Sequence, residues 1–200
     1  MGLPQLKTHY MTEQEYLDSE KLREIRHEYI DGEIYAMSGG KLNHQRLISR
    51  LVQQIGNHLE GTPCEVFSSD IKVRADAGNK YFYPDVLVSC NNEDGDSVFT
   101  ESPRLIVEVL SKSTRKYDKT FKRICYQAIP SLEEYVLIEQ DHVEIEVCRK
   151  SQNWKSEFYF IDDEITFDSI DLTLPVLDIY KRVDNEEMRE FLNMNHQKES

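Results

Sequence analysis

The order in which helical and strand-like patterns follow one another is the feature that most constrains the fold of this chain. Residues 42–59 carry apolar side chains at helical spacing, which stops at a glycine and a proline in residues 61–63. Helical spacing returns at residues 117–129, before Pro130. Strand-like runs occupy the rest of this region: residues 65–74, 84–90, 105–110, 135–138 and 143–148. The resulting order of helix, three strands, helix and strand predicts an α/β (α+β) fold.

The flanking segments predict additional elements. Thr12 and Glu15 fit a capping box, so a short helix is expected to begin there. Residues 29–35 contain two apolar stretches around an Asp-Gly pair, the commonest signal for a β-hairpin. The tail after Val183 is polar and expected to be peripheral. Two hundred residues suffice for one domain with a substantial core, so we expect a single domain over residues 1–200.

The cysteines and the distribution of apolar residues bear on the compartment. The four cysteines form no close pair, no CxxC motif and no metal-ligand spacing, which argues against a disulfide scaffold and a structural zinc site. We therefore expect buried free thiols at Cys64, Cys90, Cys125 and Cys148. The chain opens with no signal-like segment and has no apolar stretch near the roughly 18 residues of a membrane span. These features predict a cytoplasmic protein with no membrane partner.

Two strand-like runs each carry one carboxylate. Asp85 follows Pro84 at the start of one run, and Glu108 lies near the end of the next. If the two strands are antiparallel neighbours, the carboxylates converge, and the long polar segment at 91–103 permits that pairing. An unpartnered carboxylate in an apolar strand costs several kcal/mol, so a hard divalent cation is one natural partner. The alternative is an ordinary ion pair with Arg or Lys, or a solvent-facing strand end.

A basic segment lies beside these carboxylates. The net charge of −13 means that a polyanion could be captured only by a local basic surface. Residues 104–123 hold seven basic and two acidic side chains, a local charge of +5, which leaves −18 on the other 180 residues. This surface would suit a nucleic-acid backbone; a solvated helix face balanced by acidic neighbours is the alternative. The residues expected to contact phosphate are Arg115, Lys116, Lys119 and Arg123.

Several motifs resemble one nuclease family. They are EYIDGEIY at 28–35, His44, PDVLV at 84–88, IVEVLSKSTRKYD at 106–118 followed by Lys122 and Tyr126, and EEYVLIE at 133–139. Together they resemble a restriction-endonuclease family of Uma type, a domain of unknown function within the PD-(D/E)XK nuclease superfamily. The similarity spans about residues 10–183. It implies a restriction-endonuclease-like core with a central mixed β-sheet flanked by helices, plus the N-terminal hairpin and C-terminal strands.

The resemblance also implies a metal site and a reaction. Asp85 and Glu108 would be catalytic residues and ligands of Mg²⁺ (or Mn²⁺), with the Val109 carbonyl as a third ligand. The reaction would be metal-dependent hydrolysis of phosphodiester bonds in DNA. Because nucleases of this kind often use two sites for two strands, the resemblance also implies a homodimer.

One position departs from the superfamily pattern. A lysine usually stands two residues after the acidic residue on its strand, where this chain has Leu110. In many members of this family the lysine lies on the next helix, at the position of Lys122. Asp118, Lys122 and Tyr126 are spaced four apart and share one helical face, so Lys122 is our candidate for the catalytic cation. The alternative is a solvated lysine paired with Asp118, and Lys112 and Lys119 are the alternate cations.

Other polar residues are weaker candidates for supporting contacts. Asp70 could supply a second-shell or second-metal contact, although an exposed position is the simpler expectation. His44 could assist at the rim of the site, although a lone helical histidine is more often a polar surface residue. Asp118 and Tyr126 complete the set of supporting candidates.

Three functions are consistent with these features. The leading hypothesis is a Mg²⁺-dependent DNA endonuclease. The second is a non-catalytic protein of the PD-(D/E)XK fold that binds nucleic acid or a protein partner, which the missing strand lysine favours. The third is a dimerising structural protein whose carboxylates are surface charges. No helix-turn-helix, zinc-finger or RNA-binding signature is present, so the sequence does not indicate which DNA sequence, if any, is preferred.

Overall fold

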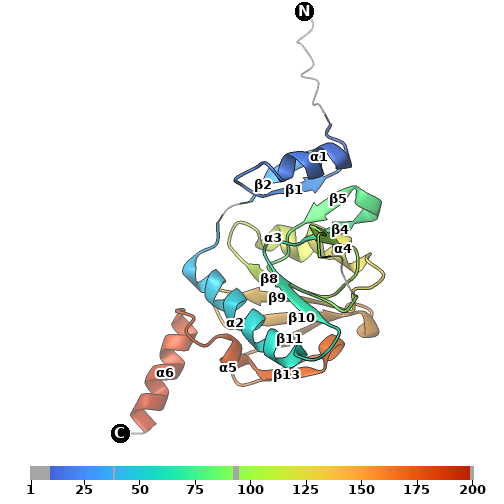
Figure 1. Ribbon diagram of the computed structural model, residues 1–200. Coiled ribbons are helices and arrows are strands. Elements are labelled where there is room, and N and C mark those ends of the chain that lie inside the picture. Colours follow the sequence, from blue (N-terminus) through green and yellow to red (C-terminus); the bar gives the residue numbers. More distant parts are fainter. Residues whose placement is uncertain (1–9, 38, 92–94, 199–200) are drawn as a thin grey trace, which may run out of the picture.

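The computed structural model describes residues 10–37, 39–91 and 95–198, with side chains to residue 194. Its core is a six-stranded sheet in the order β11-β10-β9-β8-β6-β3. The central parallel pair is β8 (Pro103–Leu110) and β9 (Glu134–Glu139), and the other pairs are antiparallel. The outer strands are β3 (Glu65–Ser68), β6 (Val86–Ser89), β10 (Ile145–Arg149) and β11 (Ser156–Tyr159). This mixed sheet flanked by helices confirms the expected fold class (Figure 1).

Helices cover both faces of this sheet. The side chains of β8 alternate between the two faces, so each face presents apolar residues for a helix to cover. Leu105, Val107 and Val109 pack with the apolar stripe of α2 (Leu42–Leu59). Ile106 and Leu110 pack on the opposite face, against the helical segment that follows β8. That segment consists of α3 (Arg115–Tyr117), a π-helical turn (Asp118–Lys122) and α4 (Arg123–Gln127). Glu108 belongs to the same alternating set as Ile106 and Leu110, so its carboxylate faces the π-helical turn.

A second sheet packs beside the core in the order β2-β1-β5-β4-β7. Its hairpin, β1 (His27–Ile30) and β2 (Glu33–Ala36), turns at Asp31 and Gly32, where φ is 48° and 93°. The capping box at Thr12 begins α1 (Glu13–Glu20), as expected. The remaining strands are β4 (Lys72–Ala75), β5 (Lys80–Phe82) and β7 (Phe99–Thr100).

The C-terminal part contributes to the core. Strands β12 (Glu164–Phe167) and β13 (Leu172–Pro175) form a separate hairpin, followed by α5 (Val176–Ile179) and α6 (Glu186–Lys198). Met188 in the first turn of α6 is buried in the main apolar cluster, and the Val143 amide donates to Glu187. The start of the tail is therefore docked rather than peripheral. None of the helices in the described ranges is long and apolar enough to cross a membrane.

Three expectations about elements were wrong in detail. The run 65–74 is not one strand: a bend at Ser69, with φ of 58°, sends β3 and β4 into different sheets. The run 84–90 forms strand only from Val86, because Pro84 and Asp85 precede the first paired residue. The second long helix begins at Arg115 and is interrupted by the π-helical turn.

The cysteine expectation was wrong for two of the four residues. Cys64 and Cys90 form a disulfide, while Cys125 and Cys148 are free thiols. The pairing of β3 with β6 places Glu65 opposite Ser89, so the residues one step beyond them are also neighbours. Their sequence separation of 26 gave no signal of this contact. Because disulfides are rare in the cytosol, the bridge is an observation against the expected compartment.

Candidate metal-dependent active site

A cavity of about 350 Å³ lies where the β1–β2 hairpin, the start of α2 and the end of β8 meet. Its lining contains five carboxylates, three lysines and one histidine. The carboxylates are those of Glu28, Asp85, Glu108, Asp118 and Asp141. Two of the lysines, Lys41 and Lys112, are exposed at the rim, whereas Lys122 is buried inside. The cavity therefore gathers six of the eight residues that the sequence singled out for the metal site and its supporting contacts.

Asp85 and Glu108 converge as the antiparallel pairing predicts. Val86 lies opposite Val107 in the β6–β8 ladder, so the carboxylate before Val86 and the one after Val107 are neighbours. The backbone amide of Val109 donates to Oδ2 of Asp85 at 2.7 Å. In a strand the N–H and C=O of one residue point to the same edge, so the Val109 carbonyl also faces the side of Asp85.

Lys122 enters the cavity from the π-helical turn. Its Nζ lies 2.8 Å from Oε1 of Glu28, 3.1 Å from Oε1 of Glu108 and 3.7 Å from Oδ1 of Asp118. The side chain is 7 % exposed, which excludes the solvated-lysine alternative. A π-helical turn inserts an extra residue into the helical repeat, and such turns are frequent at functional sites. Here the turn ends at the lysine that contacts Glu108.

Electrostatics keep this lysine charged. Burial alone would lower the pKa of Lys122, but the charges of Glu108, Glu28 and Asp118 raise it well above its usual range. Burial raises the pKa of Glu108 well above its usual value; the charge of Lys122 opposes this, and that of Asp118 adds to it. Burial likewise raises the pKa of Asp118. One ammonium group faces several buried carboxylates, so this cavity is short of positive charge.

His44 lies in the first turn of α2 and faces Asp85. Its Nε2 is 3.2 Å from Oδ2 of Asp85, and its side chain is 14 % exposed. Burial acts to lower the pKa of His44, but the hydrogen bond and charge of Asp85, with a hydrogen bond to the Val109 backbone, raise it. His44 is therefore part of the cavity and not the surface residue that a lone helical histidine suggests.

Two further residues complete the surroundings of Lys122 and Glu108: Tyr126 contacts Glu108, and Glu28 contacts Lys122. The Tyr126 hydroxyl donates to Oε1 of Glu108 at 3.1 Å, from one helical turn beyond Lys122. Glu28 on β1 was missed as a site residue, although it stands in the EYIDGEIY motif. A carboxylate in a mostly buried strand was the available signal, the same one that identified Asp85 and Glu108.

Asp70 does not join the cavity. It lies in the bend between β3 and β4, its side chain is 72 % exposed, and it pairs with Arg26. Asp70 is therefore an exposed residue, as the simpler of the two expectations held, and contacts none of the described residues of the metal site.

The predicted basic surface is largely neutralised by neighbouring strands. Nη2 of Arg115 lies 2.6 Å from Glu139, and Nη1 of Arg123 lies 2.7 Å from Glu146. Lys119 lies 3.7 Å from Glu139 and 3.4 Å from Glu146. We call these five residues, together with Glu144, the paired network. Of the four predicted phosphate contacts, Lys116 alone is exposed, and the other three are partly buried.

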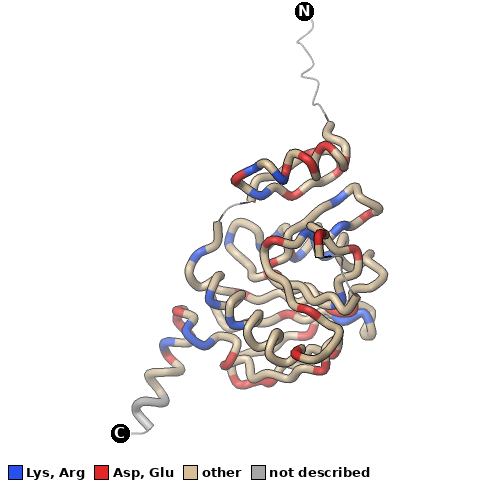
Figure 2. Tube along the Cα trace, viewed as in Figure 1, with Lys and Arg blue, Asp and Glu red and all other residues tan. Residues whose placement is uncertain are grey.

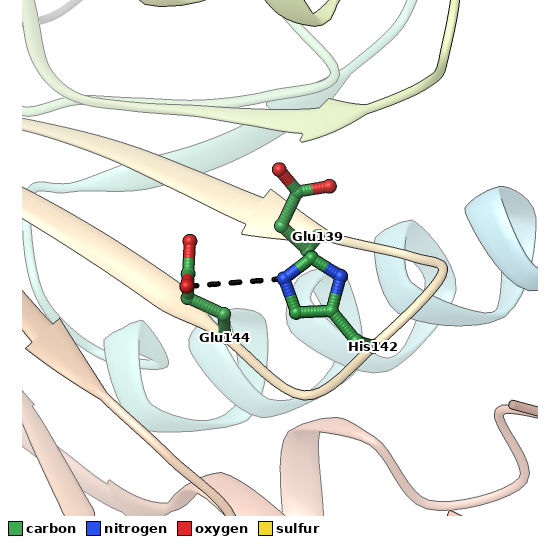
Figure 3. A group of neighbouring side chains, drawn as sticks. All are labelled: Glu139, His142 and Glu144. Atoms are coloured by element: carbon green, nitrogen blue, oxygen red, sulfur yellow. Dashed lines mark ion pairs between the residues drawn. The ribbon is translucent and has the colours of Figure 1, made fainter. Parts of the chain in front are cut away.

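A second group of potential metal ligands lies on the β9–β10 hairpin, within and beside the paired network. Ligand atoms of Glu139, His142 and Glu144 lie within 4.8 Å of one another (Figure 3). Both carboxylates already face cations, however, because Glu139 accepts from Arg115 and Glu144 lies 3.6 Å from Lys119. The cavity at Glu108, where buried carboxylates outnumber buried cations, has the stronger need for a metal ion.

Comparisons with known proteins bear on the family and the fold of the chain. Residues 13–177 match the model of the Uma2 family, described as "Putative restriction endonuclease". Uncharacterized protein slr1290 of Synechocystis sp. is 38% identical over 174 residues, covering 86% of this chain and 92% of that protein. Uncharacterized protein sll1609 of the same organism is 35% identical over 146 residues, covering 72% of this chain and 82% of its own. A crystal structure from Anabaena variabilis, titled as a "putative nuclease belonging to DUF820", superposes with a TM-score of 0.68. It is 22% identical, with coverage of 86% of this chain and 98% of that one, so it supports the fold.

Proposed function

Because the chain belongs to the Uma2 family and has a nuclease-like fold, we propose that it is a Mg²⁺-dependent DNA endonuclease. The observation that carries the proposal is the buried contact of 3.1 Å between Lys122 Nζ and Glu108 Oε1. It supplies from the helix the cation that the strand lacks, since Leu110 is buried and apolar. The proposed catalytic residues are Asp85, Glu108 and Lys122.

The residues present fit a hard divalent cation. Mg²⁺ and Mn²⁺ prefer oxygen ligands, and Mg²⁺ is usually held by one or two carboxylates plus waters and substrate phosphate. We propose the carboxylates of Asp85 and Glu108 and the Val109 carbonyl as the protein ligands. The shortage of positive charge in the cavity supports this assignment. When bound, the ion would lower the pKa of a water molecule and neutralise charge on the phosphoryl oxygens.

The protein residues would divide the remaining work. Lys122 would donate to the attacking water or to a phosphoryl oxygen, and its raised pKa would keep it cationic. Tyr126 and Lys122 both contact Oε1 of Glu108, which fixes the carboxylate on the cavity side of β8. The Val109 amide and His44 hold Oδ2 of Asp85 in the same way. Such neighbours orient ligands and tune their basicity.

One observation favours the non-catalytic alternative: the apolar Leu110 stands in place of the strand lysine. A homodimer belongs to the proposal as well. So does a cytoplasmic location, although a disulfide such as Cys64–Cys90 is rare in that compartment. The homodimer follows from the need to cut two strands with two copies of one site, and sedimentation of the purified chain would test it.

Cleavage of supercoiled and linear DNA is the direct test. The wild-type protein should nick or linearise DNA with Mg²⁺ or Mn²⁺ and lose this activity in EDTA. Asp85→Asn should abolish it, whereas Asp70→Asn, a change of an exposed carboxylate outside the cavity, should not. A pure wild-type protein that binds the metal and never cleaves would favour the non-catalytic alternative.

A further inference from the structure

A second cavity, of about 550 Å³, runs along the outer side of α2 and differs in charge from the first. All of its charged lining residues are cations: Arg46, Arg50, Lys181 and Arg182. The rest of the lining is one leucine and three neutral polar residues, Gln45, Ser49 and Gln53. We call the surface formed by these four cations the α2 groove.

The cations of the α2 groove are not neutralised as those of the paired network are. Within the described ranges, none of the four lies within ion-pair distance of a carboxylate. Arg46 donates to the side-chain oxygen of Asn43 at 3.0 Å. Arg50 donates to the backbone carbonyl of Asp178 at 3.0 Å, which fixes its direction without cancelling its charge. In a chain with a net charge of −13, four such side chains around one cavity form a local basic surface.

The α2 groove adjoins the candidate active site through the start of α2. Lys41 and His44 line the active-site cavity, and Leu42 and Gln45 line the groove. A helix rises 1.5 Å per residue, so Arg46 and Arg50 lie only about 3 and 9 Å further along the axis than His44. Figure 2 shows basic positions along α2 beside others in the segment between α5 and α6.

We propose that the α2 groove binds the phosphate backbone of the DNA next to the scissile phosphate; the inference rests on the proposed function. The proposed ligand is the phosphodiester backbone of a DNA strand, because the groove, within the described residues, is lined by guanidinium and ammonium groups and by no carboxylate. The groove carries affinity and not sequence preference, since phosphate contacts position a duplex without reading its bases. In this proposal the α2 groove makes the phosphate contacts that the sequence predicted for Arg115, Lys119 and Arg123.

A variant that removes charge while keeping the fold tests this assignment. Arg46→Gln, Lys181→Gln and Arg182→Gln together remove three exposed cations and leave Arg50 on the Asp178 carbonyl. The matched control replaces three exposed cations outside both cavities, Lys21, Arg23 and Lys155, by glutamine. Equal thermal unfolding midpoints of the two variants and the wild type would show that the fold is kept.

The measurement is fluorescence anisotropy of a labelled DNA duplex, with Ca²⁺ replacing Mg²⁺, over a series of salt concentrations. The groove variant should bind at least about tenfold more weakly at low salt, and its salt slope should fall by about one per lost phosphate contact. The control should match the wild type. Equal affinity and slope in the groove variant, or a wild type that binds no duplex, would overturn the groove assignment.

Two further outcomes separate this inference from the proposed function. If the wild type binds through the groove but never cleaves with Mg²⁺ or Mn²⁺, the groove assignment stands and the endonuclease proposal fails. If the wild type cleaves and the groove variant binds and cleaves equally well, the endonuclease proposal stands and the groove assignment fails. If polyglutamate at equal charge concentration displaced the duplex, the groove would be assigned to an acidic protein, and its assignment to DNA would be overturned.

Discussion

The active-site cavity and the paired network differ in how their carboxylates are neutralised. In the cavity, Lys122 is the one buried ammonium group facing Glu28, Glu108 and Asp118. In the paired network, Arg115, Lys119 and Arg123 face Glu139, Glu144 and Glu146, so every carboxylate has a cation. Both regions use side chains from the helical segment after β8. In our proposal the unmatched buried carboxylates hold a metal ion, whereas the matched ones hold the helix on the sheet.

The largest expected effect comes from removing one carboxylate from each region. Glu108→Gln should abolish Mg²⁺ binding and cleavage. It should also stabilise the metal-free protein, because it removes a carboxyl group whose pKa is raised by burial. Glu139→Gln should leave Mg²⁺ binding intact and destabilise the fold by about 1–3 kcal/mol through weaker bonds to Arg115. Calorimetric Mg²⁺ titration and urea unfolding measure both. Loss of metal binding in Glu139→Gln alone would reverse the assignment of the two regions.

A lysine from each region gives the next comparison. Lys122→Ala should slow single-turnover DNA cleavage by at least about tenfold, or ~1.4 kcal/mol of transition-state stabilisation, with little change in DNA affinity. Lys119→Ala should cleave at the wild-type rate, since its ammonium group faces Glu139, Glu144 and Glu146. Equal rates for Lys122→Ala and the wild type would show that the helix lysine does not replace the strand lysine.

The histidine of the cavity can be compared with the histidine of the second ligand group. His44→Ala should weaken Mg²⁺ binding by about tenfold, because residues that orient a metal ligand commonly contribute 10–100-fold to affinity. His142→Ala should leave it unchanged, since His142 contacts Glu144 at 3.8 Å outside the cavity. Calorimetric titration would again decide. An unchanged affinity in His44→Ala would remove His44 from the site.

The smallest expected effect is a pH dependence of stability whose sign differs between the regions, because the pKa values of Glu108 and Asp118 are raised and that of Glu146 is lowered. The folded state raises the pKa of Glu108 above 4.5 and that of Asp118 above 3.8, so it holds these protons more tightly than the unfolded chain does. The two protonated groups stabilise the fold fully when the pH is below these ordinary pKa values. This stabilisation is lost as the pH rises through the raised pKa values of the folded state. The free energy of unfolding without Mg²⁺ should therefore fall with rising pH, by up to ~1.4 kcal/mol per pH unit for each proton. Urea unfolding of wild type and Glu108→Gln measures it, and identical slopes would contradict the account.

The sequence predicted those parts of the fold and site that depend on local patterns. The bounds of α2 follow from its apolar stripe and its stop signal, and the convergence of Asp85 with Glu108 follows from strand polarity. Lys122 was placed near the cavity by helical spacing from Asp118, although the π-helical turn that positions it has no sequence signal known to us.

Contacts between distant segments were beyond prediction. The sequence left open whether acidic neighbours balance the basic surface of residues 104–123, because its counter-charges, Glu139 and Glu146, come from β9 and β10. The Cys64–Cys90 bridge depends on the β3–β6 pairing in the same way. Glu28 reaches Lys122 only because the N-terminal hairpin packs over the core. In each case the sheet order, and not the spacing along the chain, decides which residues meet.

Anomalous diffraction from crystals soaked in Mn²⁺ tests the central claim most directly. We expect a peak between the carboxylates of Asp85 and Glu108, about 2.1 Å from their oxygens and from the Val109 carbonyl. The peak should disappear in Asp85→Asn crystals. A peak at Glu139, His142 and Glu144 instead, or none at Asp85 in crystals that hold Mn²⁺ elsewhere, would contradict the assignment of the active site.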